Sequence, residues 1–103
     1  IPYPLTFYFE IYGLETDRSG TSFYAVDYKI TPLGKRRRGP VLEEVSSVVS
    51  SKFETTAAGP DQVQRLEIAT ENLWEGSFEL TVTVTDRRTR ESVRRSARFS
   101  VLE

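Results

Sequence analysis

Hydrophobic and polar residues alternate along much of this chain with a period of two, which is the period of a β-strand that buries one face. Near the start, every odd position from Leu5 to Ile11 is apolar, while Thr6, Tyr8 and Glu10 lie between them. A glycine and a short turn-forming stretch follow. We therefore predict a first strand here, with its odd positions facing the core.

The same alternation predicts two more long strands. The buried side of the second strand consists of Tyr24, Val26, Tyr28 and Ile30. In the last third of the chain, threonine and glutamate alternate with an inward row made of Phe78, Leu80, Val82 and Val84. The many β-branched residues of this stretch support a strand.

Residues 86–90 are predicted as a hairpin turn, and a closing strand follows it. The inward side of that strand carries Val93, Ala97, Phe99 and Val101. Arg95 falls on the same inward side. A charge in this position predicts either that the strand lies at a sheet edge or that a bulge shifts its register.

Residues 41–57 fit two patterns. The apolar residues of 41–49 are spaced like one stripe of a helix, whereas alternate positions from Val45 to Thr55 would share one face of a strand. We favour the strand, because the many Val, Ser and Thr residues are poor helix formers. A loop with the basic run 35–38 is predicted before this segment. A second loop (57–61) and a short strand (62–69) are predicted after it.

Six or seven strands spaced by about a dozen residues predict an all-β fold, an antiparallel β-sandwich of the immunoglobulin-like or fibronectin-like kind. The length of 103 residues suits a single domain over residues 1–103. The chain starts at Ile1 without an initiator methionine or a signal-peptide pattern. We therefore expect it to be a domain excised from a longer chain.

The composition narrows the chemistry. The chain has no His and no Cys, which excludes disulfides, thiol nucleophiles and the commonest zinc ligands. A net charge of −1 argues against a nucleic-acid partner, and no apolar run is long enough to span a membrane. The aspartates at 17, 61 and 86 stand apart in the sequence as turn residues, so we expect neither a metal site nor a cofactor.

Catalysis would need paired carboxylates or a Ser–Lys pair. Glu43 and Glu44 are adjacent, so on a strand they point to opposite faces. The serines near Lys52 are not spaced as a Ser-x-x-Lys helix start. We therefore do not expect an enzyme.

The stretch 7–14, the turn at Asp17 and Gly20, the following Tyr-x-Val-x-Tyr strand and the stretch 73–86 together resemble the C-terminal region of bacterial GWxTD-domain proteins. The Gly-Trp-x-Thr-Asp signature itself is absent here. The resemblance implies an immunoglobulin-like accessory domain of a bacterial protein exported to the periplasm or the cell surface. Arg90 stands where the hairpin of such domains often has Gly, and at a positive φ it would cost about 1 kcal/mol.

Three groups of residues are candidate binding sites. Tyr8 and Tyr12 share the outward face of the first strand, where they could stack on a sugar, dock a protein or remain solvated. Trp74 could form a similar platform, but we favour a role as a plug over the end of the core. The third group is a basic surface, formed by Arg36, Arg37, Arg38, Arg87, Arg88 and Arg90.

We predict a non-catalytic interaction domain whose partner is a protein, either the rest of its parent chain or another subunit. The alternative is a carbohydrate-binding module that uses exposed aromatic residues. A contact with an anion or a nucleic acid through the arginines is a third and weaker hypothesis, because these clusters lack the interleaved aromatic residues of single-strand binders.

Overall fold

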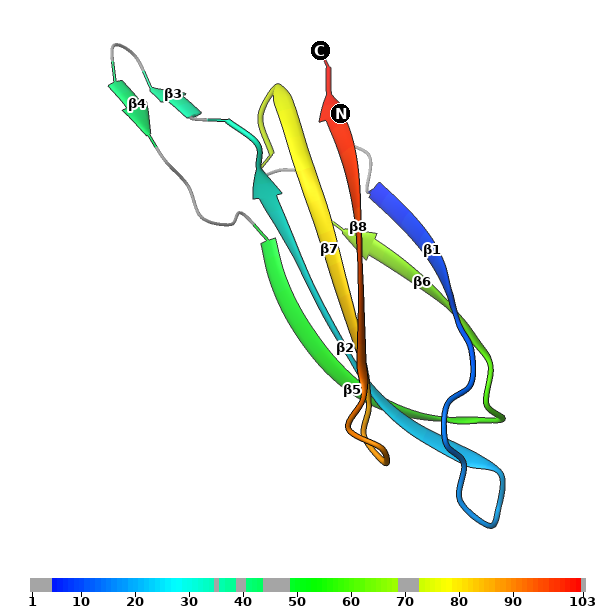
Figure 1. The fold of residues 1–103 in the computed structure, drawn as a ribbon. Helices are drawn as coiled ribbons and strands as arrows, with labels where there is room; N and C mark the ends of the chain where they lie inside the picture. Colours follow the sequence, from blue (N-terminus) through cyan, green and yellow to red (C-terminus); the bar gives the residue numbers. More distant parts are fainter. Residues whose placement is uncertain (1–4, 35, 39–40, 44–48, 69–72, 103) are drawn as a thin grey trace.

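The computed structural model describes residues 5–34, 36–38, 41–43, 49–68 and 73–102 (Figure 1). This part of the chain contains strands and no helix, so it has no helix that could cross a membrane. The strands are β1 (Leu5–Ile11), β2 (Thr21–Pro32), β3 (Arg36–Arg38), β4 (Val41–Glu43), β5 (Val49–Ala58), β6 (Gln62–Ile68), β7 (Gly76–Asp86) and β8 (Ser92–Val101).

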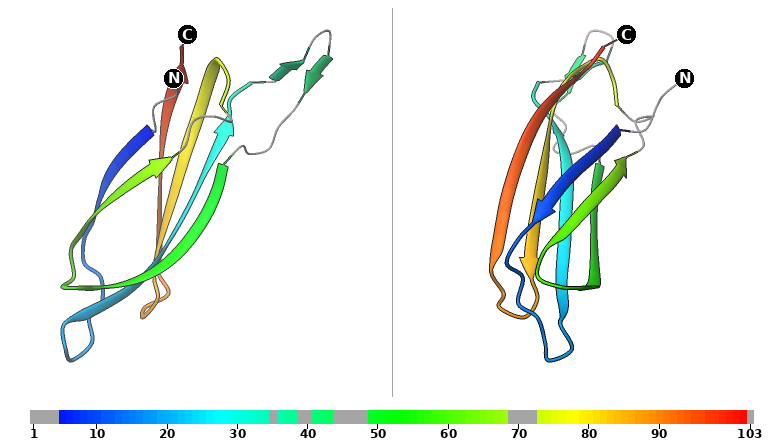
Figure 2. Two further views of the ribbon diagram at one scale, coloured as in Figure 1. Left: turned by 180° about the vertical axis from the view of Figure 1, so that it is seen from behind. Right: turned by 90° about the vertical axis from the view of Figure 1, so that its right-hand side faces the viewer.

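Six of these strands form two packed sheets, and all of their pairings are antiparallel. The larger sheet has the order β5-β2-β7-β8, and the smaller sheet consists of β1 and β6 (Figure 2). The predicted antiparallel β-sandwich is confirmed. Strands β3 and β4 pair only with each other and extend beyond one end of the larger sheet (Figures 1 and 2).

The core lies between the two sheets and is built from the inward rows that the alternation predicted. Its largest fully buried side chains are Tyr24, Val26 and Ile30 from β2 and Phe78 from β7. Burial of each of these side chains stabilises the fold by about 1.5–3 kcal/mol. The hydroxyl of Tyr24 accepts a hydrogen bond from Gln64 Nε2 of β6, so the most buried phenol is satisfied across the two sheets.

The ambiguous segment 41–57 is extended where it is described. Val41–Glu43 forms β4 and Val49–Ala58 forms β5, while residues 44–48 lie outside the described residues. The strand favoured for this segment is confirmed over residues 49–57. Two boundaries differ from the prediction: β5 runs into the predicted loop as far as Ala58, and Arg36–Arg38, predicted as loop, pairs with Val41–Glu43. A short backbone ladder forms without alternating side chains, so the sequence pattern carried no sign of it.

The pairing of β7 with β8 explains the inward arginine. The register runs without a break from Gly76 opposite Val101 to Thr85 opposite Ser92, and Arg95 lies opposite Val82. A bulge is therefore excluded. The other expectation is confirmed, because β8 is the outermost strand of its sheet.

Candidate functional site

A groove separates β1 from the β7–β8 end of the larger sheet. The smaller sheet has only two strands and faces a sheet of four, so it cannot cover the whole inner face. The groove has a volume of about 690 Å³. Its apolar lining comes from β1 (Phe7, Phe9, Ile11), from β7 (Leu80, Val82, Val84) and from β8 (Val93, Ala97).

Exposure increases across the inner face of the larger sheet toward its β8 edge. Leu80 and Val82 of β7 are 4% and 9% exposed, whereas Val93 of β8 is 56% exposed. Ala97, also inward on β8, is exposed as well. From Val93 to Ala97, the inward row of β8 thus has the pattern of a core strand without its burial, whereas Phe99 and Val101 farther along are partly buried.

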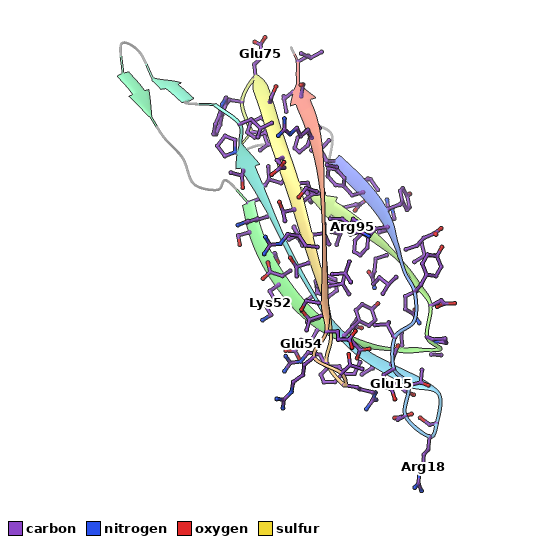
Figure 3. All side chains as sticks on the ribbon, in the orientation of Figure 1. Glu15, Arg18, Lys52, Glu54, Glu75 and Arg95 are labelled. Carbon is purple, nitrogen blue, oxygen red and sulfur yellow. The ribbon has the colours of Figure 1, made fainter. Side chains whose placement is uncertain are left out.

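Charged side chains line the groove together with the apolar ones. Arg95 lines it from β8, and Figure 3 shows this residue beside β8 on the side toward β1 and β6. Its Nη1 donates a hydrogen bond to the carbonyl oxygen of its neighbour Arg94 (3.1 Å). Glu10, Glu15 and Glu91 line the groove as carboxylates. The apolar lining is therefore bordered by one inward cation and several anions.

Two contacts at this groove join the larger sheet to β1 and to the loop that follows β1. At one end, the rings of Phe7 and Phe99 meet edge to face with centroids 5.9 Å apart. At the other end, the N–H of Glu15 donates to Asp86 Oδ2 (2.8 Å). The groove between these contacts therefore follows β1 along most of its length.

Asp86 is the buried acid that makes the second of these contacts. Its Oδ1 accepts the N–H groups of Arg88 (2.9 Å) and Thr89 (3.4 Å) inside the hairpin turn. Burial raises the pKa of Asp86, but the three N–H donors and the positive charge of Arg88 outweigh it, and the pKa lies below its ordinary value. One carboxylate thus shapes the β7–β8 turn and holds the loop after β1.

Arg88 fixes the same turn to the loop before β2. Its Nη2 donates to Asp17 Oδ2 (3.3 Å) and to the carbonyl oxygen of Thr21 (3.1 Å). The hydroxyl of Ser19 is the main cause of a lowered pKa at Asp17, assisted by the N–H groups of Thr21 and Ser19 and by the charge of Arg88. Arg88 is therefore held by the fold and is not free for an external anion.

Arg90 has a φ of 68°, which is the left-handed conformation that glycine adopts readily. It is the conformation considered for this position because the hairpins that this chain resembles often have Gly there. We expect Arg90→Gly to raise the free energy of unfolding by about 0.5–1 kcal/mol, because relief of the strain exceeds the added entropy of the unfolded chain. Urea denaturation would measure this change. Arg87→Gly is the matched control, since Arg87 is exposed in the same turn without a positive φ, and it should destabilise the domain. An equal effect of both substitutions would contradict the explanation by strain.

Tyr8 and Tyr12 lie on the outward face of the smaller sheet, 69% and 70% exposed. The hydroxyl of Tyr12 donates a hydrogen bond to Glu10 Oε2. Tyr8 lies opposite Arg65 of β6. The pKa of the Arg65 guanidinium is raised, first by its hydrogen bond with Tyr8 and then by the negative charge of Glu67. Val63, 69% exposed, belongs to the same face. The predicted aromatic-polar face is thus present, and Tyr8, Glu10 and Tyr12 also border the groove from the side of β1.

Trp74 begins a row of aromatic rings that extends through the core. It packs edge to face on Phe78 (centroids 5.2 Å apart), and Phe78 stacks on Phe99 (5.7 Å). Trp74 is half-buried, and its ring contacts the core. This geometry matches the role of a plug over the end of the core.

The predicted basic residues do not form one surface in the described part of the chain. Arg87 and Arg90 are exposed at the hairpin tip, whereas Arg88 is bonded to the neighbouring loop. The side chains of Arg36, Arg37 and Arg38 lie outside the described residues. No group of three or more acidic residues, among those that the structure describes, is placed to hold a metal ion.

The groove was not predicted from the sequence. Alternation identifies which side chains point inward, but it does not say which strands of two facing sheets lie opposite each other. Arg95 was the available signal, because a charge in an inward row marks a position that the core does not close over. The chain matches none of the protein-family models, curated proteins or solved structures with which it was compared.

Proposed function

We propose that this domain is a non-catalytic interaction module that binds another polypeptide at the open side of its sandwich. The observation that supports this proposal most directly is the groove beside β1, whose apolar lining includes the exposed Val93 and Ala97. An apolar surface bounded by polar residues is typical of protein-binding sites. The seven-residue β1 edge next to it offers backbone groups that a polypeptide can pair with and a glycan cannot.

We also propose that the domain is an accessory part of a bacterial GWxTD-type protein exported to the periplasm or the cell surface. The support for this origin is the resemblance carried by residues 7–14 and 73–86. The parent chain or another subunit would then supply the bound polypeptide.

A panel of ligand classes tests the proposed function. The ¹⁵N-labelled domain would be titrated with a pool of short peptides of alternating apolar and polar residues, with soluble glycans and with calcium. We expect the peptides alone to shift amide resonances and to raise the unfolding midpoint by about 10 °C near one hundred times the Kd. A response to glycans or calcium without a response to peptides would reject the interaction module.

A carbohydrate-binding module is the second candidate, and the exposure of Tyr8 and Tyr12 on one sheet face favours it. Tyrosine rings on a flat face can stack on the apolar faces of sugar rings. In the same panel, this candidate requires glycan-induced shifts at Tyr8 and Tyr12 that are lost in the double variant Tyr8→Ala/Tyr12→Ala. Glycan-induced shifts confined to β7 and β8 would reject it.

A further inference from the structure

Within the described part of the chain, the sandwich has four sheet edges without a paired strand, and they differ in how well they are protected against further pairing. Natural edge strands avoid unwanted pairing by means of charges, prolines, bulges or short length. The β8 edge carries three arginines (94, 95 and 98), β5 carries Lys52 and Glu54, and β6 carries Arg65 and Glu67. Strand β1 is seven residues long with the sequence LTFYFEI, which contains one charge and no proline. β1 is therefore the edge best suited to accept another strand.

A strand added to the free edge of β1 would lie over the inward row of β8. Neighbouring strands are about 4.8 Å apart and packed sheets about 10 Å apart, so one added strand would occupy the groove at the depth of a normal sandwich layer. Every second side chain of this strand would point at the larger sheet. Along the strand, these side chains would face in turn Val84 and Val93, then Arg95, then Ala97. This row requires apolar residues with one carboxylate opposite the guanidinium.

We propose that an extended segment of another polypeptide binds beside β1 as the third strand of the smaller sheet. The segment carries apolar side chains at every second position and places one carboxylate against Arg95. The inference rests on the proposed interaction function and gives it a site, a backbone geometry and a sequence requirement.

A second copy of this domain fits the site poorly. In a symmetric dimer, the β1 strands of the two copies would pair with each other. The β8 strand of each copy already extends past its own β1, so the two β8 strands would compete for the same space beneath the new pair. The strands with the required apolar alternation, β2 and β7, are paired on both sides within their own sheet. A separate segment with a free backbone satisfies both conditions.

The probe is a synthetic peptide of the length of β1, in which valine alternates with threonine and one central valine is replaced by glutamate. Two N-methylated versions separate backbone pairing from side-chain burial, because methyl groups on alternate residues block only one edge of a strand. We expect one version to bind the domain like the parent peptide and the other to lose at least tenfold in affinity. Equal affinities of the two versions would overturn the pairing with β1.

The side-chain requirement is tested with Arg95→Glu against Arg94→Glu. These neighbours on β8 undergo the same change of charge but point to opposite faces of the sheet. We expect Arg95→Glu to weaken binding of the glutamate peptide by about tenfold or more and Arg94→Glu to leave it within about twofold. A peptide with lysine in place of glutamate should recover binding to Arg95→Glu. The same loss in both variants, or no recovery, would refute the contact with Arg95.

Amide shifts distinguish a failure of this inference from a failure of the proposed function. Peptide-induced shifts along β1 and β8, with the domain monomeric by sedimentation, are the expected result. Peptide-induced shifts along β5, or confined to β6, would overturn the β1 site and retain an interaction module. Self-association through β1 would replace the proposed segment with a second copy. No response to any peptide would reject the interaction function itself.

Discussion

Phe78→Ala is expected to lower the free energy of unfolding by about 3–5 kcal/mol, the largest effect predicted for this chain. The side chain of Phe78 is 0% exposed and lies between Trp74 and Phe99, so its removal leaves a cavity bordered by both rings. Denaturation in urea, followed by the fluorescence of Trp74, measures the loss directly because this is the only tryptophan.

Two comparisons make this expectation specific. Phe78→Leu keeps much of the volume and should cost less than Phe78→Ala. Tyr8→Ala removes a ring of similar size that is 69% exposed, and we expect a change within about 0.5 kcal/mol. A similar cost for Phe78→Ala and Tyr8→Ala would contradict the position of the core described above. Such a loss is large for a domain whose total stability is expected to be about 5–15 kcal/mol.

Asp86→Asn is expected to lower the free energy of unfolding by about 2 kcal/mol at pH 7. The amide keeps the shape of the side chain but has one acceptor oxygen in place of two. It therefore leaves the N–H of Glu15 or that of Arg88 without its partner. Asp61→Asn is the matched control, since Asp61 is exposed and accepts one N–H, that of Gly13 (3.1 Å). We expect that control to change the stability by less than about 0.5 kcal/mol.

The effect of Asp86→Asn should depend on pH. The folded-state pKa of Asp86 lies below the ordinary value of 3.8, so the ionised carboxylate adds stability above that value. This contribution is lost as the pH falls through the folded-state pKa. The difference between parent and variant should therefore be constant near neutrality and should shrink below about pH 4. The lowered pKa of Asp17 affects both proteins equally, and a difference that grows in acid would contradict the role of Asp86.

The strands could be predicted from the sequence because each long strand buries only one face. Phe78, Leu80 and Val82 alternate with threonine and glutamate, and the structure places these three residues in the core. The inward position of Arg95 was foreseen from its place in the alternation, whereas a positive φ at Arg90 was suggested only by the resemblance to hairpins that often have Gly there. All of these features depend on neighbours in the sequence.

The groove depends on residues that are distant in the sequence, and for this reason it could not be predicted. No periodicity within residues 5–11 says that β1 pairs with β6 on one side only. The role of Asp86 was foreseen only as a turn residue, because its bond to the N–H of Glu15 joins two loops that the fold alone brings together. The two tyrosines were correctly placed on an outward face, but no pattern in the sequence showed that they also border a groove facing β7 and β8.

The order of the strands also has a consequence for how the chain folds. The pairing of β7 with β8 closes a tight turn, whereas β1 joins β6 through pairs such as Leu5 with Ile68, and β2 joins β7 through pairs such as Tyr24 with Asp86. Long loops must lose their entropy before such distant pairs form, and proteins dominated by distant pairs fold in milliseconds to seconds. We infer that the hairpin forms early and that β1 is among the last strands to dock. The strand proposed to receive a foreign segment is then also the strand that a newly synthesised chain leaves undocked for longest.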